Sequence, residues 1–240
     1  MRPLRVAMGD TEAGAIIESQ RMSARGYVST IGFQLIQPML DLIEELGDGN
    51  VGYPNEVQTS VWENGYSTAI IVLSALILES AANRVRYLRK EPGDKPAPDY
   101  LRSLLGDDLG ARIDEVFVAR DVVAHNHMWE GQIDDIDGVL RFCGDPVLVL
   151  GKRADRYRRS ISTTAPRLTN ILQLNLIPSR IWRDDVLKVV NLLEVVLETL
   201  EQMDASYYQT NNHAFTFRGE YVSIRTAVER INRDRLGLQS

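Results

Sequence analysis

The side chains best suited to chemistry lie close together near the middle of the chain. Residues 116–125 have the sequence VFVARDVVAH, in which Arg120 and Asp121 interrupt an apolar stretch and His125 ends it. Arg120 follows Ile113 by seven positions, so in a helix both residues lie on one apolar stripe. An unpaired charge on a buried stripe is costly, so a partner or a ligand must neutralise Arg120.

These residue types suit proton transfer beside a phosphate group. Such a step needs a base for the proton and a cation near the phosphate. The imidazole of His125 titrates near neutrality, and the guanidinium of Arg120 can grip phosphate oxygens with two parallel donors. Asp121 and His125 are four positions apart and share a helical face, so the carboxylate can orient the imidazole.

A second long apolar stretch carries one isolated charge, Glu79, between Tyr66 and Asn83. Two apolar helices that each carry a charge suggest a shared polar pocket in which Glu79 pairs with Arg120. The alternative is a buried ion pair that only fixes the register of the two helices. The sequence leaves both interpretations open.

Residues 120–125, RDVVAH, resemble the Arg-x4–6-His motif of the HEPN superfamily, in which Asn, Asp or His commonly follows the arginine. His127 also falls within the permitted spacing and is kept as a second candidate. We favour His125 because it shares a helical face with Asp121. The resemblance covers roughly residues 60–205, where a long apolar helix precedes a proline-rich break and the motif ends the next long helix.

This resemblance implies a predominantly all-α fold, an antiparallel helical bundle of the HEPN type with an inserted β-hairpin. It implies a metal-independent endoribonuclease of toxin or defence type, with a composite site where two copies of the motif meet at a dimer interface. RNA and an antitoxin or regulatory protein are the implied partners. The implied catalytic residues are Arg120, Asp121, His125 and His127. Some members have a modified tyrosine where this chain has His127, so that regulation is not expected here.

Three other interpretations compete with a ribonuclease. A non-catalytic HEPN-like module would bind a nucleotide or a partner as a dimer, and a purely structural bundle would use Arg120 and His125 only for stability. A metal site would need more ligands than His125 and His127, because the aspartates of residues 134–137 look like turn residues. We therefore expect no metal and no other cofactor, with Arg120 supplying the charge that a metal would provide.

A short basic segment stands out in a chain whose net charge is −6. Residues 152–159, KRADRYRR, hold five basic side chains and one acidic one. Such a segment on an acidic body is either a solvated surface or a contact for phosphate groups. The candidate substrate-binding residues are Lys152, Arg153, Arg156, Arg158 and Arg159.

The elements that must position these residues follow from periodicity and turn residues. Helices are expected at residues 31–46, 64–90, 99–105, 109–124, 184–203 and 223–236. Asp137-Gly138 between apolar runs predicts a β-hairpin within residues 128–150, and residues 215–222 look extended. We divide the chain into a poorly structured segment (1–28), a HEPN-like bundle (29–206) and a C-terminal extension (207–240).

The remaining expectations concern the environment of the chain. The N-terminal residues lack a secretory signal, and Cys143 has no second cysteine to pair with. The longest strongly apolar run, residues 69–78, is too short to span a bilayer, so we expect a cytoplasmic protein without membrane contact. Val118 and Val122 lie off the apolar stripe of their helix. They would need a second surface to cover them, which predicts a homodimer.

Overall fold

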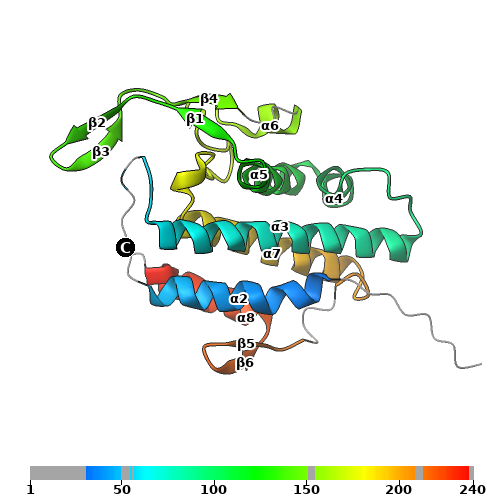
Figure 1. The fold of residues 1–240 in the computed structure, drawn as a ribbon. Helices are drawn as coiled ribbons and strands as arrows, with labels where there is room; N and C mark the ends of the chain where they lie inside the picture. Colours follow the sequence, from blue (N-terminus) through cyan, green and yellow to red (C-terminus); the bar gives the residue numbers. More distant parts are fainter. Residues whose placement is uncertain (1–30, 50–54, 56, 151–154, 209–212, 238–240) are drawn as a thin grey trace, which may run out of the picture. The chain divides into compact units, whose positions relative to one another are not determined.

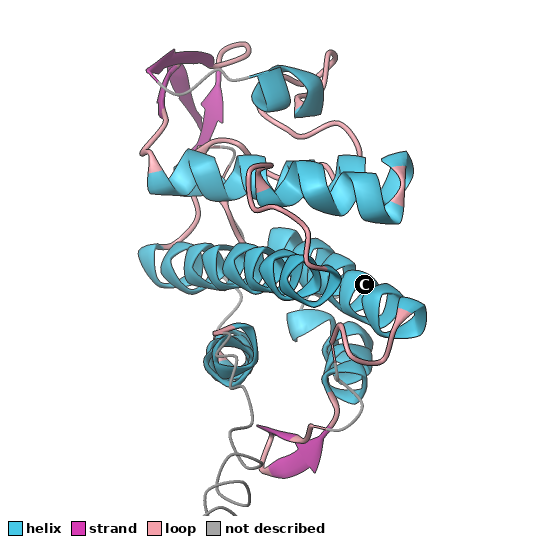
Figure 2. Ribbon diagram, turned by 90° about the vertical axis from the view of Figure 1, so that its right-hand side faces the viewer, coloured by secondary structure: helices cyan, strands magenta, loops and turns pink. Residues whose placement is uncertain are grey.

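The computed structural model describes residues 31–49, 55, 57–150, 155–208 and 213–237. This part of the chain is predominantly helical (Figures 1 and 2), as the sequence predicts. The predicted N-terminal segment 1–28 and the candidate residues Lys152 and Arg153 lie outside the described residues. The helices are α2 (Gly32–Asp48), α3 (Val61–Arg89), α4 (Ala97–Leu105), α5 (Asp107–Ala124), α6 (Asp155–Ser160), α7 (Arg183–Met203) and α8 (Ile224–Asp234).

Helix α3 is the central element because its middle is apolar on nearly every side. Ile70, Ile71 and Ile77 are fully buried, and α2, α5 and α7 all pack against this helix. The helix begins three residues before the predicted start, since Ser60 caps it by accepting a hydrogen bond from the Glu63 N–H at 3.2 Å. By length and composition α3 could cross a membrane, but half of its apolar window is buried in the protein, as in a core helix.

The helices do not form one antiparallel bundle. Figure 1 shows α2 and α3 lengthwise and running in opposite directions, whereas α5 is seen almost end-on and crosses α3 steeply. The short helix α4 packs closely on α5 at Gly110, where an added Cβ would lie 2.5 Å from the Arg102 Cγ. The antiparallel arrangement therefore holds for α2 and α3 but not for the helix that carries the candidate motif.

The predicted β-hairpin forms between α5 and α6. Strand β2 (Ile133–Ile136) pairs with β3 (Val139–Phe142), and the flanking strands β1 (Met128–Glu130) and β4 (Val147–Leu150) pair next to this hairpin. Asp137 and Gly138 both have positive φ, at 56° and 80°, which is the backbone that a tight hairpin turn requires. Figure 1 shows β2 and β3 projecting beyond the helices, while β1 and β4 lie over the end of α5.

The N-terminal ends of α3 and α7 are joined by a fully buried ion pair. The Arg183 Nε and Glu63 Oε1 atoms are 2.8 Å apart, and Arg183 also donates to the carbonyl of Leu236. Helix α7 starts one residue earlier than predicted, and its first turn is capped by Asp185, which accepts from the Trp182 N–H at 3.1 Å, rather than by Asp184.

The predicted C-terminal extension is part of the same core as the helical bundle. Strands β5 (Phe215–Phe217) and β6 (Glu220–Val222) form a small hairpin before α8, within the stretch predicted to be extended. Buried side chains of this region, including Phe217, Ile231 and Leu236, belong to the main hydrophobic cluster. Residues 213–237 therefore stabilise the bundle instead of forming an appendage.

Candidate active site at the end of helix α5

Arg120 lies in the last two turns of α5 with its guanidinium at the surface of the protein. Its side chain is 29% exposed, and its Nε atom is 3.2 Å from the Asp121 Oδ1 atom. The guanidinium carbon also lies 5.4 Å from the centre of the Phe117 ring. Arg120 is thus held by an acidic and an aromatic neighbour while part of its side chain stays open to solvent.

Asp121 pairs with Arg120 and not with His125, which differs from our expectation. His125 is exposed at the C-terminal end of α5, where its backbone N–H donates to the Asp121 carbonyl at 2.9 Å. Within the described part of the chain, its imidazole forms no hydrogen bond or ion pair. The arginine side chain is long enough to fold back along the helix surface, and so it takes the carboxylate predicted to orient the imidazole.

The second candidate, His127, points into the protein. Asn126 has a positive φ of 46°, and this left-handed residue reverses the chain so that the His127 N–H donates to the Val122 carbonyl at 3.0 Å. The His127 side chain is 2% exposed, and its ring centre lies 5.6 Å from that of Tyr157. Burial lowers the pKa of His127, and the nearby Asp121 carboxylate opposes that effect.

The structure does not bring Glu79 together with Arg120. Glu79 is half-buried on α3, and among the described residues it forms no ion pair or hydrogen bond. The charge of Arg120 is instead balanced within its own helix, by Asp121. The shared polar pocket predicted from these two charges is therefore absent from the described residues.

The basic segment splits into residues with different roles. Arg156 is turned towards the protein, with its Nε atom 3.1 Å from the Asp114 Oδ1 atom and its Nη2 atom 3.2 Å from the Asp99 Oδ2 atom. Arg159 Nη2 lies 3.8 Å from the same Asp114 carboxylate. Arg158 is 70% exposed, and its ion pair with Asp155 is loose, at 3.9 Å. Of the three described candidates, Arg158 is the one most open to a phosphate group.

Two buried carboxylates in the middle of α5 were not singled out from the sequence. Asp114 is 1% exposed and is also bound by Arg102, whose Nη2 atom lies 2.7 Å from Oδ2. Glu115 accepts two backbone hydrogen bonds of 2.7 Å, from the N–H groups of Ile171 and Leu172. Through these bonds the two acids hold α4, α6 and residues 171–172, which belong to the segment before α7, against α5. A pair of adjacent acids inside an apolar helix was the sequence signal for them.

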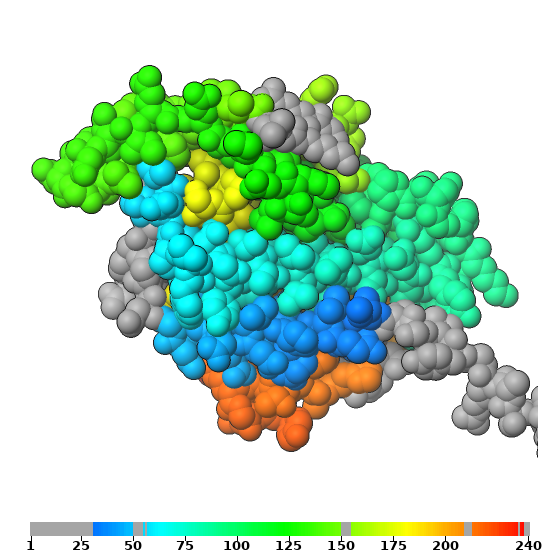
Figure 3. Space-filling model, viewed as in Figure 1, coloured from blue at the N-terminus to red at the C-terminus, as the bar shows by residue number. Residues whose placement is uncertain are grey.

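Val118 and Val122 are covered within the chain, so they do not need a second copy. Together with Leu148, Tyr157 and Leu176 they form a small second core, against which Trp129 and Ile161 pack. The strands β1 and β4 and the helix α6 supply this cover. The segment before α7, yellow in Figure 3, fills the space between these strands and the start of α3. The burial of these two valines therefore no longer gives a reason to expect a dimer.

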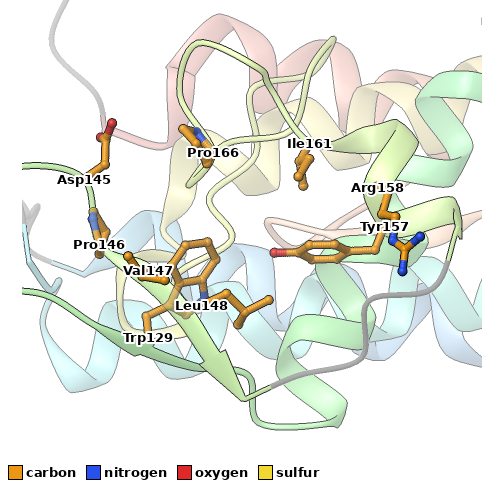
Figure 4. A pocket seen from close by; sticks show the side chains of 9 residues that line it. All are labelled: Trp129, Asp145, Pro146, Val147, Leu148, Tyr157, Arg158, Ile161 and Pro166. Atoms are coloured by element: carbon orange, nitrogen blue, oxygen red, sulfur yellow. The ribbon is translucent and has the colours of Figure 1, made fainter.

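Next to this second core lies an apolar pocket of about 410 Å³. Its walls come from β1, β4 and α6 and from the loops beside them (Figure 4). Tyr157, which lines the pocket, also contacts the His127 ring. The lining residues are Trp129, Asp145, Pro146, Val147, Leu148, Tyr157, Arg158, Ile161 and Pro166.

The described residues contain no group of three or more His, Cys, Asp or Glu side chains arranged to hold a metal ion. Comparisons of the chain with models of protein families, with curated protein sequences and with solved structures gave no match.

Proposed function

We propose that this protein is a metal-independent endoribonuclease of the HEPN type, acting through Arg120 and His125. The observation that supports it is the end of α5, where an arginine paired with Asp121 and an exposed histidine lie five residues apart. A fixed guanidinium and an accessible imidazole are the two groups that cleavage of RNA by its own 2′-hydroxyl requires. A role as a toxin or in defence, with a regulatory partner in the cytoplasm, belongs to this proposal.

In this mechanism His125 takes the proton of the 2′-hydroxyl group, whose oxygen attacks the neighbouring phosphorus. The bond from phosphorus to the 5′-oxygen breaks, leaving a 2′,3′-cyclic phosphate and a 5′-hydroxyl group. Arg120 stabilises the charge that develops on the phosphate oxygens. Asp121 holds the guanidinium in place, and the buried His127 supports the turn rather than transferring protons.

A second copy would provide the imidazole that protonates the leaving 5′-oxygen. A surface for it lies beside His125, on the outer face of the β1–β4 pair. Met128, Val147 and Val149 are 53%, 63% and 58% exposed there, while Trp129 and Leu148 of the same strands face the protein. Three neighbouring exposed apolar side chains favour an interface at this end of α5. The composite site is thus proposed on this face and not on the face of Val118.

The test is cleavage of single-stranded RNA in excess EDTA, with analysis of the product ends. The variants are Arg120→Ala and His125→Ala. Arg112→Ala, at an exposed arginine of the same helix, and His213→Ala, at an exposed histidine elsewhere, are the matched controls. We expect cyclic phosphate ends from the wild type and both controls. A rate that EDTA abolishes would contradict the proposal.

A non-catalytic module that binds nucleotides or a partner is the second candidate. The first observation in its favour is the pairing of Asp121 with Arg120, because the expected partner of the His125 imidazole is then taken by the arginine. The steep crossing of α5 over α3 also departs from the antiparallel arrangement implied by the resemblance. Such a module would bind RNA or nucleotides and cleave nothing.

A further inference from the structure

We propose that the pocket between β1, β4 and α6 binds one nucleotide of the RNA substrate, with the base against Trp129 and Tyr157 and a phosphate at Arg158. This inference rests on the proposed function and adds a substrate subsite to it. The RNA specificity of the site would then depend on the inserted β segment and not only on the α5 motif.

The walls of the pocket have the composition that a base requires. Trp129 lies on one side and Tyr157 on another, with aliphatic side chains and two prolines between them (Figure 4). Aromatic faces stack on bases of any sequence, and a pocket of about 410 Å³ has room for a base and its ribose. Leu148 and Tyr157 also belong to the second core, so these walls are preformed.

The polar groups of the pocket match the two ends of a nucleotide. In Figure 4, Asp145 and Arg158 lie at opposite ends, with the apolar walls between them. Arg158 is 70% exposed and only loosely paired, so it can bind a phosphate. The carboxylate of Asp145 can accept a hydrogen bond from an N–H group of a base.

The pocket is linked to the proposed active site by a short path through the protein. Tyr157 contacts the His127 ring, and His127 is two residues after His125 at the start of β1. The pocket therefore lies next to the turn that presents His125.

The test uses Trp129 as the only tryptophan, in the Trp62→Phe/Trp182→Phe background. The protein is titrated with AMP, adenosine, inorganic phosphate, a short adenine-rich RNA and, as an aromatic control, phenylalanine, and the fluorescence of Trp129 is recorded. We expect saturable quenching by AMP and RNA. Arg158→Ala should weaken AMP binding about tenfold and leave adenosine unchanged, because it removes one charged phosphate contact. Arg112→Ala is the control.

A second variant, Ile161→Phe, fills the pocket, and quenching by AMP should be lost in it while its circular dichroism stays unchanged. Should that variant not fold, Arg158→Ala carries the test, since Arg158 is exposed. Quenching that persists in His125→Ala, with no cleavage by the wild type, would support the pocket and overturn the ribonuclease. No saturable quenching, quenching by phenylalanine alone, or quenching by AMP but not by RNA would overturn the subsite.

Discussion

The middle of helix α5 and its C-terminal end carry charges in opposite circumstances. In the middle, Asp114 and Glu115 are buried, and arginine side chains or backbone N–H groups satisfy them. At the end, Arg120 is partly exposed and paired only along its own helix, and His125 is exposed without a partner for its imidazole in the described chain. The oxygens of Asp114 and Glu115 are therefore already used by partners within the protein, whereas Arg120 and His125 still have polar atoms that can bind a ligand.

This difference separates charges that maintain the structure from charges suited to chemistry. A buried carboxylate surrounded by partners contributes to stability only while every partner is present. A site for a phosphate needs the reverse, a held cation with donors left over.

The largest expected effect on stability comes from Asp114. Asp114→Ala removes the buried carboxylate that Arg102 and Arg156 share, and should lower the free energy of unfolding by about 3–5 kcal/mol. Urea denaturation monitored by circular dichroism measures this loss. Arg112→Ala on the same helix should change the stability by less than about 0.5 kcal/mol. An Asp114→Ala protein as stable as that control would refute the structural role of the middle pair.

A smaller effect is expected at the outer face of the β1–β4 pair. Val147→Lys/Val149→Lys should weaken a dimer formed through this face by about 100-fold, because each lysine would place a charge in an apolar interface. Sedimentation equilibrium at micromolar concentration measures the change. A wild-type protein that sediments as a clean monomer of 27.0 kDa would count against the dimer and the composite site.

Arg156 and Arg158 should respond differently although they are two residues apart. Arg156→Ala should cost about 1.5–3 kcal/mol of stability, since it removes hydrogen bonds to charged groups. Arg158→Ala should leave stability within about 0.5 kcal/mol and reduce the salt dependence of RNA binding by roughly 0.7 in slope, the share of one phosphate contact on a single strand. An unchanged slope would mean that Arg158 is only a solvated residue.

The smallest effect concerns pH and compares the two histidines. Burial lowers the pKa of His127 in the folded protein, so the unfolded chain binds the proton more readily. Its contribution to stability is therefore complete above about pH 6.5 and is lost as the pH falls below that value, by at most about 1.4 kcal/mol per pH unit. His127→Asn should flatten the unfolding free energy between pH 7 and 5. His125→Asn is the control, and an equal flattening by it would contradict the buried position of His127.

Local patterns were sufficient to predict most of the elements. The apolar run of α3, the stripe of α7 and the Asp137-Gly138 turn each reflect neighbours in sequence. The helix starts were less accurate, because the caps are Ser60 and Asp185, and the sequence offers several polar residues at each start.

The site was less predictable because its partners are distant in sequence or depend on one backbone angle. The hydrogen-bond partners of Asp114 and Glu115 lie up to 57 residues away in the sequence, so no local pattern reveals them. The choice between His125 and His127 depends on the left-handed conformation of Asn126, which turns one histidine outward and the other inward. The cover over Val118 and Val122 comes from strands and a helix that follow in the chain, so their burial looked like an interface.

The most direct test of the central claim is the rate of RNA cleavage in excess EDTA by the wild type, Arg120→Ala and His125→Ala. If the end of α5 is a catalytic site, each variant loses about 10²–10⁴-fold in rate and keeps wild-type stability within about 0.5 kcal/mol. The products end in a 2′,3′-cyclic phosphate, and DNA is not cut. Wild-type rates in both variants, or a wild type that cleaves no RNA, would contradict the account.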